Sequence, residues 1–241
     1  TRAILICSPN NPTGTVYRDD EIDMLAAVCR ERGLKLVADE VYREFVYDGH
    51  RHRSALTLPG MERHVVVVDS VSKRYSLCGA RIGNIVSRDP EFMAAIMRFG
   101  QARLCPPSVE QYACTALTEV PASYIAGVNA EYQKRRDTVF AALAAMPGVL
   151  VRKPEGAFYI CARLPVDDAN AFAQWLLKDF ERDGETVMVA PADGFYATPG
   201  LGRDEVRIAY VLEVPVLERA MRCLAAALET YPGRVVAATR S

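Results

Sequence analysis

Three groups of polar side chains in this sequence each follow a short apolar run, and their types could do chemistry on a small molecule. They are Asn10 and Asn11 after the run at 3–7, Asp39, Glu40 and Tyr42 after the run at 34–38, and Ser70, Ser72 and Lys73 after the run at 64–68. Together they offer an amide, carboxylates, a phenol, hydroxyls and an amine, without the spacing of a zinc site or of a catalytic triad. Taken singly, each has an ordinary reading as a turn residue, a helix cap or a solvated charge.

The elements around these groups predict that the three loops meet. The apolar runs at 3–7 and 34–38 flank a helix at 19–32, which has acids in its first turn, bases in its last and Gly33 just after it. A strand, a helix and a second strand in this order build a parallel sheet with a right-handed crossover. The Val-rich segment at 64–70 adds a strand that is buried on both faces. Ligands of such a sheet bind beyond the carboxyl ends of its strands, so we expect the three loops at one edge.

The second half of the chain changes pattern, which predicts a second domain. A strand at 82–86 and helices at 90–102, 109–118 and 123–146 continue the first part. After Pro147, short strands at 149–152, 157–161, 186–190 and 205–210 alternate with helices at 169–182 and 215–231, and the tail after Gly233 is expected to fray. The predicted fold class is α/β, with a mostly parallel sheet in residues 1–135 and a smaller α+β domain in residues 136–241.

Composition narrows the class of partner. Half of the 241 residues are hydrophobic and the formal net charge is −1, so no basic surface marks a nucleic acid or an anionic membrane as partner. No apolar stretch is long enough to cross a bilayer, and the seven cysteines include no C-x-x-C pair. These features predict a cytoplasmic protein with a small-molecule partner. The pair His50 and His52 lacks a third ligand nearby, so we expect an exposed loop there and no metal site.

Five motifs in order give the sequence a family resemblance. They are NNPTG at 10–14, ADEVY at 38–42, SVSK at 70–73 followed by Arg81, EGAFY at 155–159 and VRIAY at 206–210. In order, spacing and context this set resembles the class I/II aminotransferases of fold-type I, which use pyridoxal 5'-phosphate. The resemblance implies that residues 1–135 are part of the three-layer large domain of that fold, here incomplete, and that residues 136–241 are its small domain.

The resemblance also implies a role for each motif residue. Lys73 would form the Schiff base with the cofactor and later act as the base that moves the substrate proton. Asp39 would pair with the pyridine nitrogen and keep it protonated, which makes the cofactor ring a better electron sink. Asn11 and Tyr42 would donate hydrogen bonds to the ring oxygen. Ser70, Ser72 and Arg81 would bind the phosphate. Arg207, together with Asn11, would bind the substrate carboxylate.

The expected reaction is transfer of an amino group between an amino acid, either aspartate or a broad range, and a 2-oxo acid, in a homodimer. A lyase or decarboxylase on the same fold is an alternative, and so is an inactive fragment that serves as a dimerisation or binding module. Members of the family carry a further stretch before the NPTG strand, with a phosphate-binding helix start. We therefore expect this chain to be the C-terminal portion of such a protein. The resemblance further predicts a cis peptide bond at Asn11–Pro12.

Overall fold

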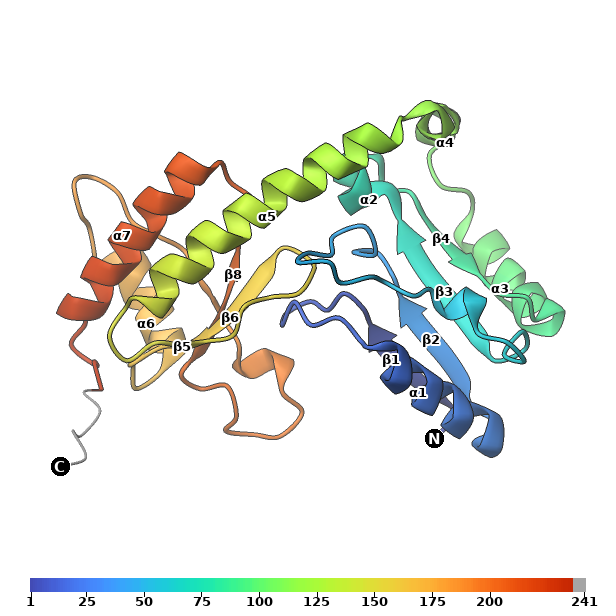
Figure 1. Cartoon of the computed structure of the whole chain (residues 1–241), viewed down its shortest axis with the longest axis horizontal. Coiled ribbons are helices and arrows are strands. Elements are labelled where there is room, and N and C mark those ends of the chain that lie inside the picture. The colour runs from blue at the N-terminus through green and yellow to red at the C-terminus, as the bar shows by residue number, and fades with distance from the viewer. Residues whose placement is uncertain (236–241) are drawn as a thin grey trace. The chain divides into compact units, whose positions relative to one another are not determined.

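A four-stranded sheet forms the centre of the first of two compact units (Figure 1). The computed structural model describes residues 1–235. The strands are β1 (Ala3–Cys7), β2 (Lys35–Asp39), β3 (Val65–Ser70) and β4 (Gly83–Val86), in that order across the sheet. The first three strands are parallel and β4 is antiparallel to β3. The prediction of an α/β fold with a mostly parallel sheet is thus confirmed.

Helix α1 (Asp19–Arg32) covers the sheet because its apolar residues fall on one side. Ile22, Ala26 and Cys29 recur at helical spacing and pack with Leu36 and Val65 in one buried cluster. The Arg18 N–H donates to the Glu21 carboxylate at 2.8 Å at the start of the helix. Gly33 ends it in the left-handed conformation, with φ of 64°. This crossover connects β1 to β2 and places their carboxyl ends at the same edge.

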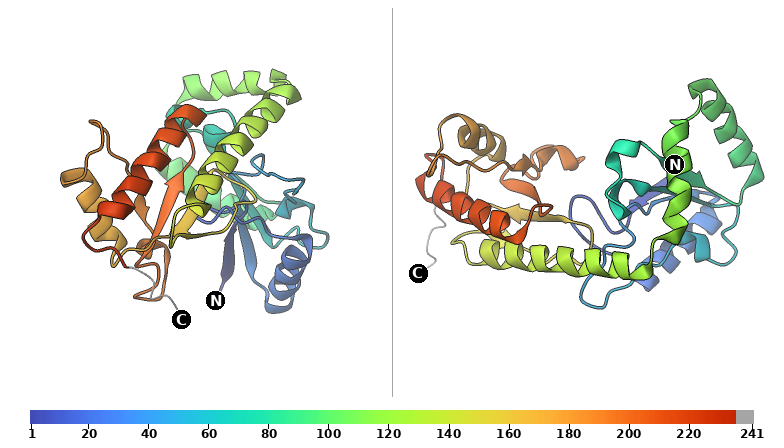
Figure 2. Two further views of the ribbon diagram at one scale, coloured as in Figure 1. Left: turned by 60° about the vertical axis from the view of Figure 1, so that its left-hand side comes forward. Right: turned by 90° about the horizontal axis from the view of Figure 1, so that it is seen from above.

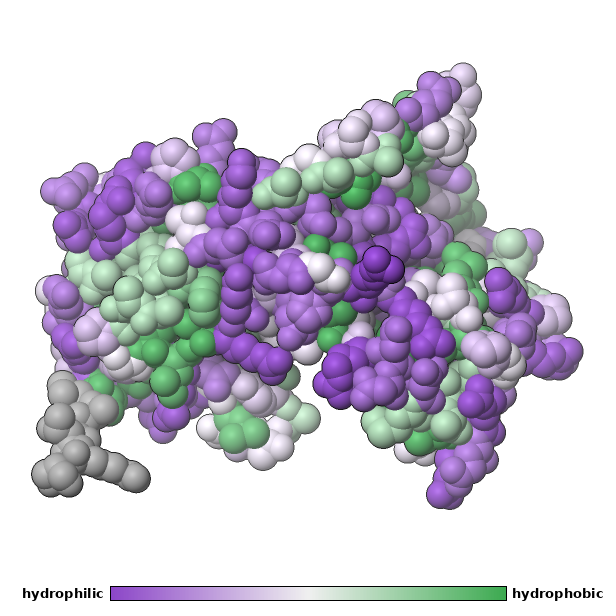
Figure 3. Space-filling model, viewed as in Figure 1, coloured by the Kyte–Doolittle hydropathy of each residue, from purple (hydrophilic) through white to green (hydrophobic). Residues whose placement is uncertain are grey.

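The other regular elements of the first unit are helices and short 3₁₀ turns. It contains the short turns η1 (Ala55–Thr57) and η2 (Cys78–Ala80), and the helices α2 (Val71–Arg74), α3 (Pro90–Arg103), α4 (Ser108–Cys114), η3 (Thr115–Glu119) and the first part of α5 (Ala122–Ala144). The single helix predicted at 109–118 is therefore two elements, because the chain tightens into a 3₁₀ turn from Thr115. Hydrophobic side chains remain on the surface here, among them Val109 and Tyr112, and Figure 3 shows hydrophobic patches interrupting a largely hydrophilic surface.

The second unit is built on an antiparallel sheet. Its strands are β5 (Leu150–Val151), β6 (Tyr159–Arg163), β7 (Ala190–Pro191) and β8 (Glu205–Ala209), in the order β5-β6-β8-β7. The other elements are α6 (Ala169–Lys178), η4 (Asp193–Phe195) and α7 (Val214–Thr230). The helix α7 lies beside the later part of α5, and residues of both line one shallow groove (Figures 1 and 2).

Several predicted elements of this unit are too long, and the strand predicted at 149–152 is paired only as β5 at 150–151. The strand predicted at 186–190 is paired only at Ala190 and Pro191, since the Thr186 hydroxyl instead donates to the Leu176 carbonyl at 2.6 Å. The helix predicted to reach Arg182 ends at Lys178. The chain leaves the helix at Asp179, and Arg182 and Glu185 then form a bridge around Gly184.

The unit and tail boundaries also differ from the sequence reading. The chain passes from the first unit to the second between Asn129 and Ala130. The second unit also includes residues 12–14, and the first also includes residues 155–157. A domain boundary at 135/136 stays a prediction. Fraying was expected after Gly233, but the Val235 N–H donates to the Pro165 carbonyl at 2.9 Å. Residues 236–241 of that tail lie outside the described residues.

The predicted cis bond is in the wrong place. Within residues 1–235 the cis peptide bond is Ser8–Pro9, and Asn11–Pro12 is trans. The loop holds two X–Pro bonds, each with a small intrinsic preference for trans, so the sequence alone does not determine which of them is cis.

Candidate functional site

The carboxyl ends of the first three strands lie side by side. In the parallel register Cys7 is opposite Asp39, and Asp39 is opposite Val68. The loops that follow β1, β2 and β3 therefore start at one edge of the sheet, as the topology predicts. Seven of the eight candidate residues lie in this first unit, namely Asn11, Asp39, Tyr42, Ser70, Ser72, Lys73 and Arg81.

Asp39 is a half-buried carboxylate without a cation beside it. Its Oδ1 accepts the Val41 N–H at 3.1 Å, and it makes no ion pair within the described residues. Burial raises the pKa of Asp39, the charges of Asp69 and Glu40 raise it further, and the Val41 N–H lowers it. A carboxylate whose negative form is disfavoured in this way gains from a positive partner. Asp39 therefore fits the protonated ring nitrogen of a pyridine cofactor.

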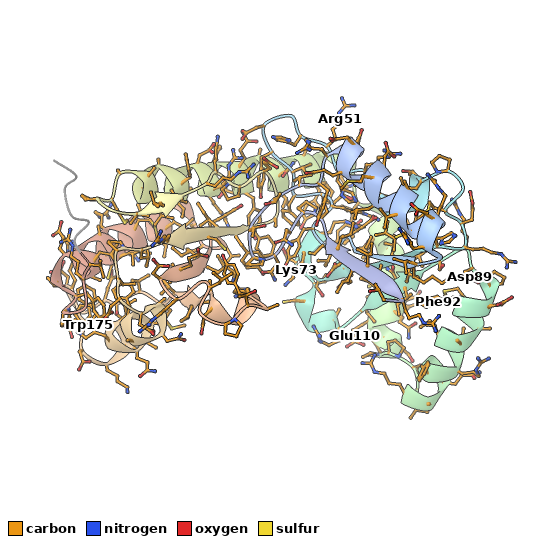
Figure 4. All side chains as sticks on the ribbon, turned by 90° about the horizontal axis from the view of Figure 1, so that it is seen from below. Arg51, Lys73, Asp89, Phe92, Glu110 and Trp175 are labelled. Atoms are coloured by element: carbon orange, nitrogen blue, oxygen red, sulfur yellow. The ribbon has the colours of Figure 1, made fainter. Side chains whose placement is uncertain are left out.

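The short helix α2 carries Lys73 and is started by a serine. The Ser70 Oγ accepts the Ser72 N–H at 3.0 Å and so caps the helix. The two serine hydroxyls lie 2.6 Å apart, and the Ser70 Oγ is also 3.0 Å from the Ile82 carbonyl oxygen. Lys73 is half-buried, on the last turn of α2 before Arg74 (Figure 4). Two hydroxyls and an amine thus lie within four residues, from the last residue of β3 to Lys73.

Arg81 lies between α2 and β4 in the left-handed conformation, with φ of 56°. Its side chain is exposed, and one guanidinium N–H donates to the Cys78 carbonyl at 2.9 Å. The other N–H groups have no protein acceptor within the described residues. A forked cation near two serine hydroxyls suits a phosphate dianion.

Asn11 and Tyr42 both contact other residues of the first unit. The Tyr42 ring is buried and meets Phe45 edge to face, with ring centroids 6.5 Å apart. The Asn11 backbone N–H interacts with the Cys7 thiol, and burial raises the pKa of that thiol while this N–H lowers it. Both residues flank the strand ends that carry Asp39, so their positions agree with a place near the cofactor ring.

Arg207 belongs to the second unit, on β8. Its guanidinium lies over two rings, 4.8 Å from the Tyr159 centroid and 5.2 Å from the Phe195 centroid. Aromatic faces attract a guanidinium and leave its N–H edge to bind a carboxylate. The sequence reading assigned Arg207 but missed both rings. Tyr159 stood in the EGAFY motif, while Phe195 lies twelve residues before Arg207 without a pattern that points to it.

One histidine was wrongly assigned to an exposed loop. His50 is exposed, but the His52 side chain is only 8% exposed and its Nε2 lies 3.2 Å from the Glu40 Oε2. The other Glu40 oxygen accepts from the Ser54 hydroxyl at 3.0 Å and from the Ala55 N–H at 2.7 Å. Burial raises the pKa of Glu40, but His52 and these hydrogen bonds outweigh it, so the pKa is lower than usual. The described residues contain no cluster of three or more metal-binding side chains.

Comparison with known proteins gives the family. The profile of aminotransferase class I and II matches residues 1–223. The chain is 31% identical over 229 residues to the aspartate aminotransferase of Bacillus subtilis, covering 92% of this chain and 56% of that protein. It is 34% identical to a probable aspartate/prephenate aminotransferase of Aquifex aeolicus, covering 95% and 58%. The crystal structure of an aromatic aminotransferase from Pyrococcus horikoshii superposes with a TM-score of 0.81 at 32% identity, over 95% of this chain and 60% of that one.

The chain therefore belongs to the class I and II aminotransferase family, whose members depend on pyridoxal phosphate. It spans a little more than half the length of the relatives it matches. No helix within residues 1–235 is long and apolar enough to cross a membrane.

Proposed function

We propose that this chain carries the cofactor site of a pyridoxal-phosphate-dependent transaminase. The reaction exchanges groups between two small acids: an amino acid gives up its amino group and becomes a 2-oxo acid, and a second 2-oxo acid takes the amino group and becomes an amino acid. The observation that carries this proposal is Asp39, a half-buried carboxylate that pairs with no cation of residues 1–235, on the strand next to the one that leads to Lys73 in a chain of this family.

The residues of the first unit fit the cofactor by their chemistry. Asp39 would hold its ring nitrogen, and Asn11 and Tyr42 its ring oxygen. Ser70, Ser72 and Arg81 would hold its phosphate. When bound, the cofactor supplies an electron sink for the pair left at the substrate Cα. Lys73 would hold the cofactor aldehyde carbon between turnovers and hold the Cα proton at Nζ during one.

The substrate side of the proposal rests on Arg207. Its guanidinium, oriented by Tyr159 and Phe195, would bind the α-carboxylate that amino acids and 2-oxo acids share. Asn11 is proposed to contact the same substrate. Several relatives are named aspartate aminotransferases, which favours aspartate or a broad range of amino acids. We also propose a homodimer in the cytoplasm; all seven cysteines are free thiols, in keeping with a reducing compartment.

A trapping experiment tests the proposal. The chain is mixed with pyridoxal phosphate, its visible absorbance is recorded, and sodium borohydride then fixes the cofactor on any lysine that holds it. Peptide mass mapping compares Lys73 with the other four lysines, Lys35, Lys134, Lys153 and Lys178. We expect the pyridoxyl group on Lys73 and a loss of the visible band in Lys73→Arg. Modification spread evenly over the surface lysines would reject the assignment.

A panel of amino acids and 2-oxo acids then identifies the reaction. Transamination yields a new amino acid from the added 2-oxo acid, whereas a lyase or decarboxylase releases an eliminated group or carbon dioxide. Detection of the latter products without the former would replace the proposed reaction by one of its alternatives.

A further inference from the structure

A cluster of four charged side chains joins the loop after β2 to the helix that carries Lys73. Asp69, the penultimate residue of β3, has a side chain only 8% exposed. Its Oδ2 lies 2.8 Å from the Arg74 Nη2 and 3.3 Å from the Arg43 Nη1. Glu44 completes the cluster, with its Oε1 3.3 Å from the Arg74 Nε and 3.5 Å from the Arg43 Nε. The cluster has two positive and two negative members, so its formal charge is zero.

The position of Asp69 and Arg74 in the chain gives the cluster its effect. Helix α2 is a single turn of four residues, too short to be stable by itself, because one turn orders several residues for few hydrogen bonds. Asp69 directly precedes its capping residue Ser70, and its Oδ1 accepts the Ser70 N–H at 2.7 Å. Arg74 is the last residue of the helix. The ion pair between them therefore closes across the turn and fixes both of its ends.

The other two members attach this turn to the neighbouring strand. Arg43 and Glu44 lie in the turn after β2, four and five residues beyond Asp39, and the Arg43 N–H donates to the Glu40 carbonyl at 3.0 Å. The Arg74 Nη2 donates a hydrogen bond to Asp69 at 2.8 Å, while its Nε forms an ion pair with Glu44 at 3.3 Å without hydrogen-bond geometry. The planar fork of a guanidinium holds these two nitrogens at a fixed spacing, which a lysine ammonium does not offer. With an Arg74 side chain only 13% exposed, solvent screens these contacts less than it screens a surface pair.

We propose that Asp69, Arg74, Arg43 and Glu44 form a clamp that fixes the α2 turn, and Lys73 on it, against the end of β2. They are positioning residues, since none of them is assigned a contact with cofactor or substrate. The importance of Lys73 rests on the proposed function, whereas the existence of the clamp does not. Nothing in the motif SVSK reveals this, because Arg43 and Glu44 lie about thirty residues away in sequence.

Hydrogen exchange of the intact chain tests the clamp without cofactor. In Asp69→Asn the amide oxygen still accepts the Ser70 N–H, while the charge that holds both arginines is lost. We expect the amides from Val71 to Ser76 to exchange about ten-fold faster than in the wild type, with the core amides of β2 unchanged. Arg74→Lys keeps the charge but not the fork, and we expect it to behave like Asp69→Asn. The matched control is Asp20→Asn, in the exposed Arg18–Asp20 pair, where we expect no change.

Borohydride trapping then tests the placement of Lys73. Starting from the wild-type pattern, we expect Asp69→Asn and Arg74→Lys to lower the rate of pyridoxyl incorporation at Lys73 by at least about ten-fold relative to Lys134, and Asp20→Asn to leave it unchanged. Exchange at 71–76 that is as slow in both variants as in the wild type would overturn the clamp. Faster exchange with an unaltered Lys73 rate would overturn its positioning role. If wild-type Lys73 takes up no cofactor, the proposed function fails, and the exchange data alone decide for or against the clamp.

Discussion

Replacing Gly156 with alanine probes how tightly the loop that carries Asn11 is packed. A Cβ at this position would lie 2.6 Å from the Phe45 carbonyl oxygen, 2.8 Å from the Pro9 Cβ and 2.9 Å from the Pro9 Cγ. Ordinary van der Waals contact begins at 3.4 Å, so the methyl group would overlap these atoms by 0.5 to 0.8 Å. None of the three belongs to a side chain that can rotate away.

The surroundings cannot yield without moving backbone. The Phe45 carbonyl accepts the Ala157 N–H at 2.9 Å, and Val46 forms a bridge with Gly156 itself. Pro9 is buried in the loop that continues into Asn11. Overpacking of a rigid site costs about 1–3 kcal/mol, and three simultaneous overlaps place this case near 3 kcal/mol. We also expect the loop to shift and the affinity for pyridoxal phosphate to fall.

Urea unfolding followed by circular dichroism measures the first effect, and titration with pyridoxal phosphate the second. Gly127→Ala is the control, because a Cβ there meets no atom within 4 Å and the position is in helix α5. Alanine in place of a helical glycine should stabilise the chain by about 0.5–1 kcal/mol. A Gly156→Ala protein as stable as the wild type, or stabilised like Gly127→Ala, would show that the three contacts are not rigid and refute the reasoning.

Three further predictions concern charged groups. The low pKa of Glu40 stabilises the fold above the pKa of an unfolded glutamate, about 4.3, and this contribution is lost as pH falls below it through the folded pKa. Glu40→Gln should therefore cost about 1–3 kcal/mol at pH 7 in urea unfolding and show a weaker pH dependence below pH 4.3; equal slopes would contradict this. The raised pKa of Asp39 has the opposite effect on stability, so Asp39→Asn should stabilise the cofactor-free chain at pH 7. This difference should shrink as pH falls toward the pKa of an unfolded aspartate, about 3.9. Cofactor affinity should fall in the same variant, and a destabilised variant would contradict the prediction. Phe195→Leu removes one ring from Arg207 and should weaken binding of a 2-oxo acid to the cofactor-loaded chain by about two- to five-fold in calorimetry, with Phe99→Leu, an exposed ring of another helix, as the neutral control.

Local signals in the sequence predicted the sheet and its covering helix well. The apolar runs before Asp39 and Lys73 and the caps of α1 depend on neighbours within a few residues, so a pattern can record them. The parallel order then placed the strand ends together without knowledge of any side-chain contact. Elements without such signals were predicted with the wrong bounds. The helix predicted through Arg182 ends at Lys178, and Arg182 instead pairs with Glu185 in the turn at Gly184.

Pairings between distant residues could not be read from the sequence. His52 lay in a polar stretch typical of an exposed loop, but folding buries it against Glu40. Arg43, Glu44 and Arg74 lie in no sequence pattern that pairs them, and such residues are usually solvated. The tight fit at Gly156 likewise depends on Pro9 and Phe45, more than one hundred residues earlier. In each case the partner is fixed only by the tertiary fold.

The three carboxylates at this edge of the sheet, Asp39, Glu40 and Asp69, differ in their partners. Asp69 is paired with two arginines, and Glu40 contacts His52 and two hydrogen-bond donors, whereas within residues 1–235 the Asp39 carboxylate accepts the Val41 N–H and meets no cation. Burial and the charges of both neighbours raise the pKa of Asp39, which disfavours its negative form unless a positive group lies beside it. The partners of Asp69 and Glu40 thus serve Asp39 as well: they hold two negative charges in place while one carboxylate is left for a positive ligand. Under the proposed function, Asp39 is therefore the carboxylate of the three that would take the cationic ring.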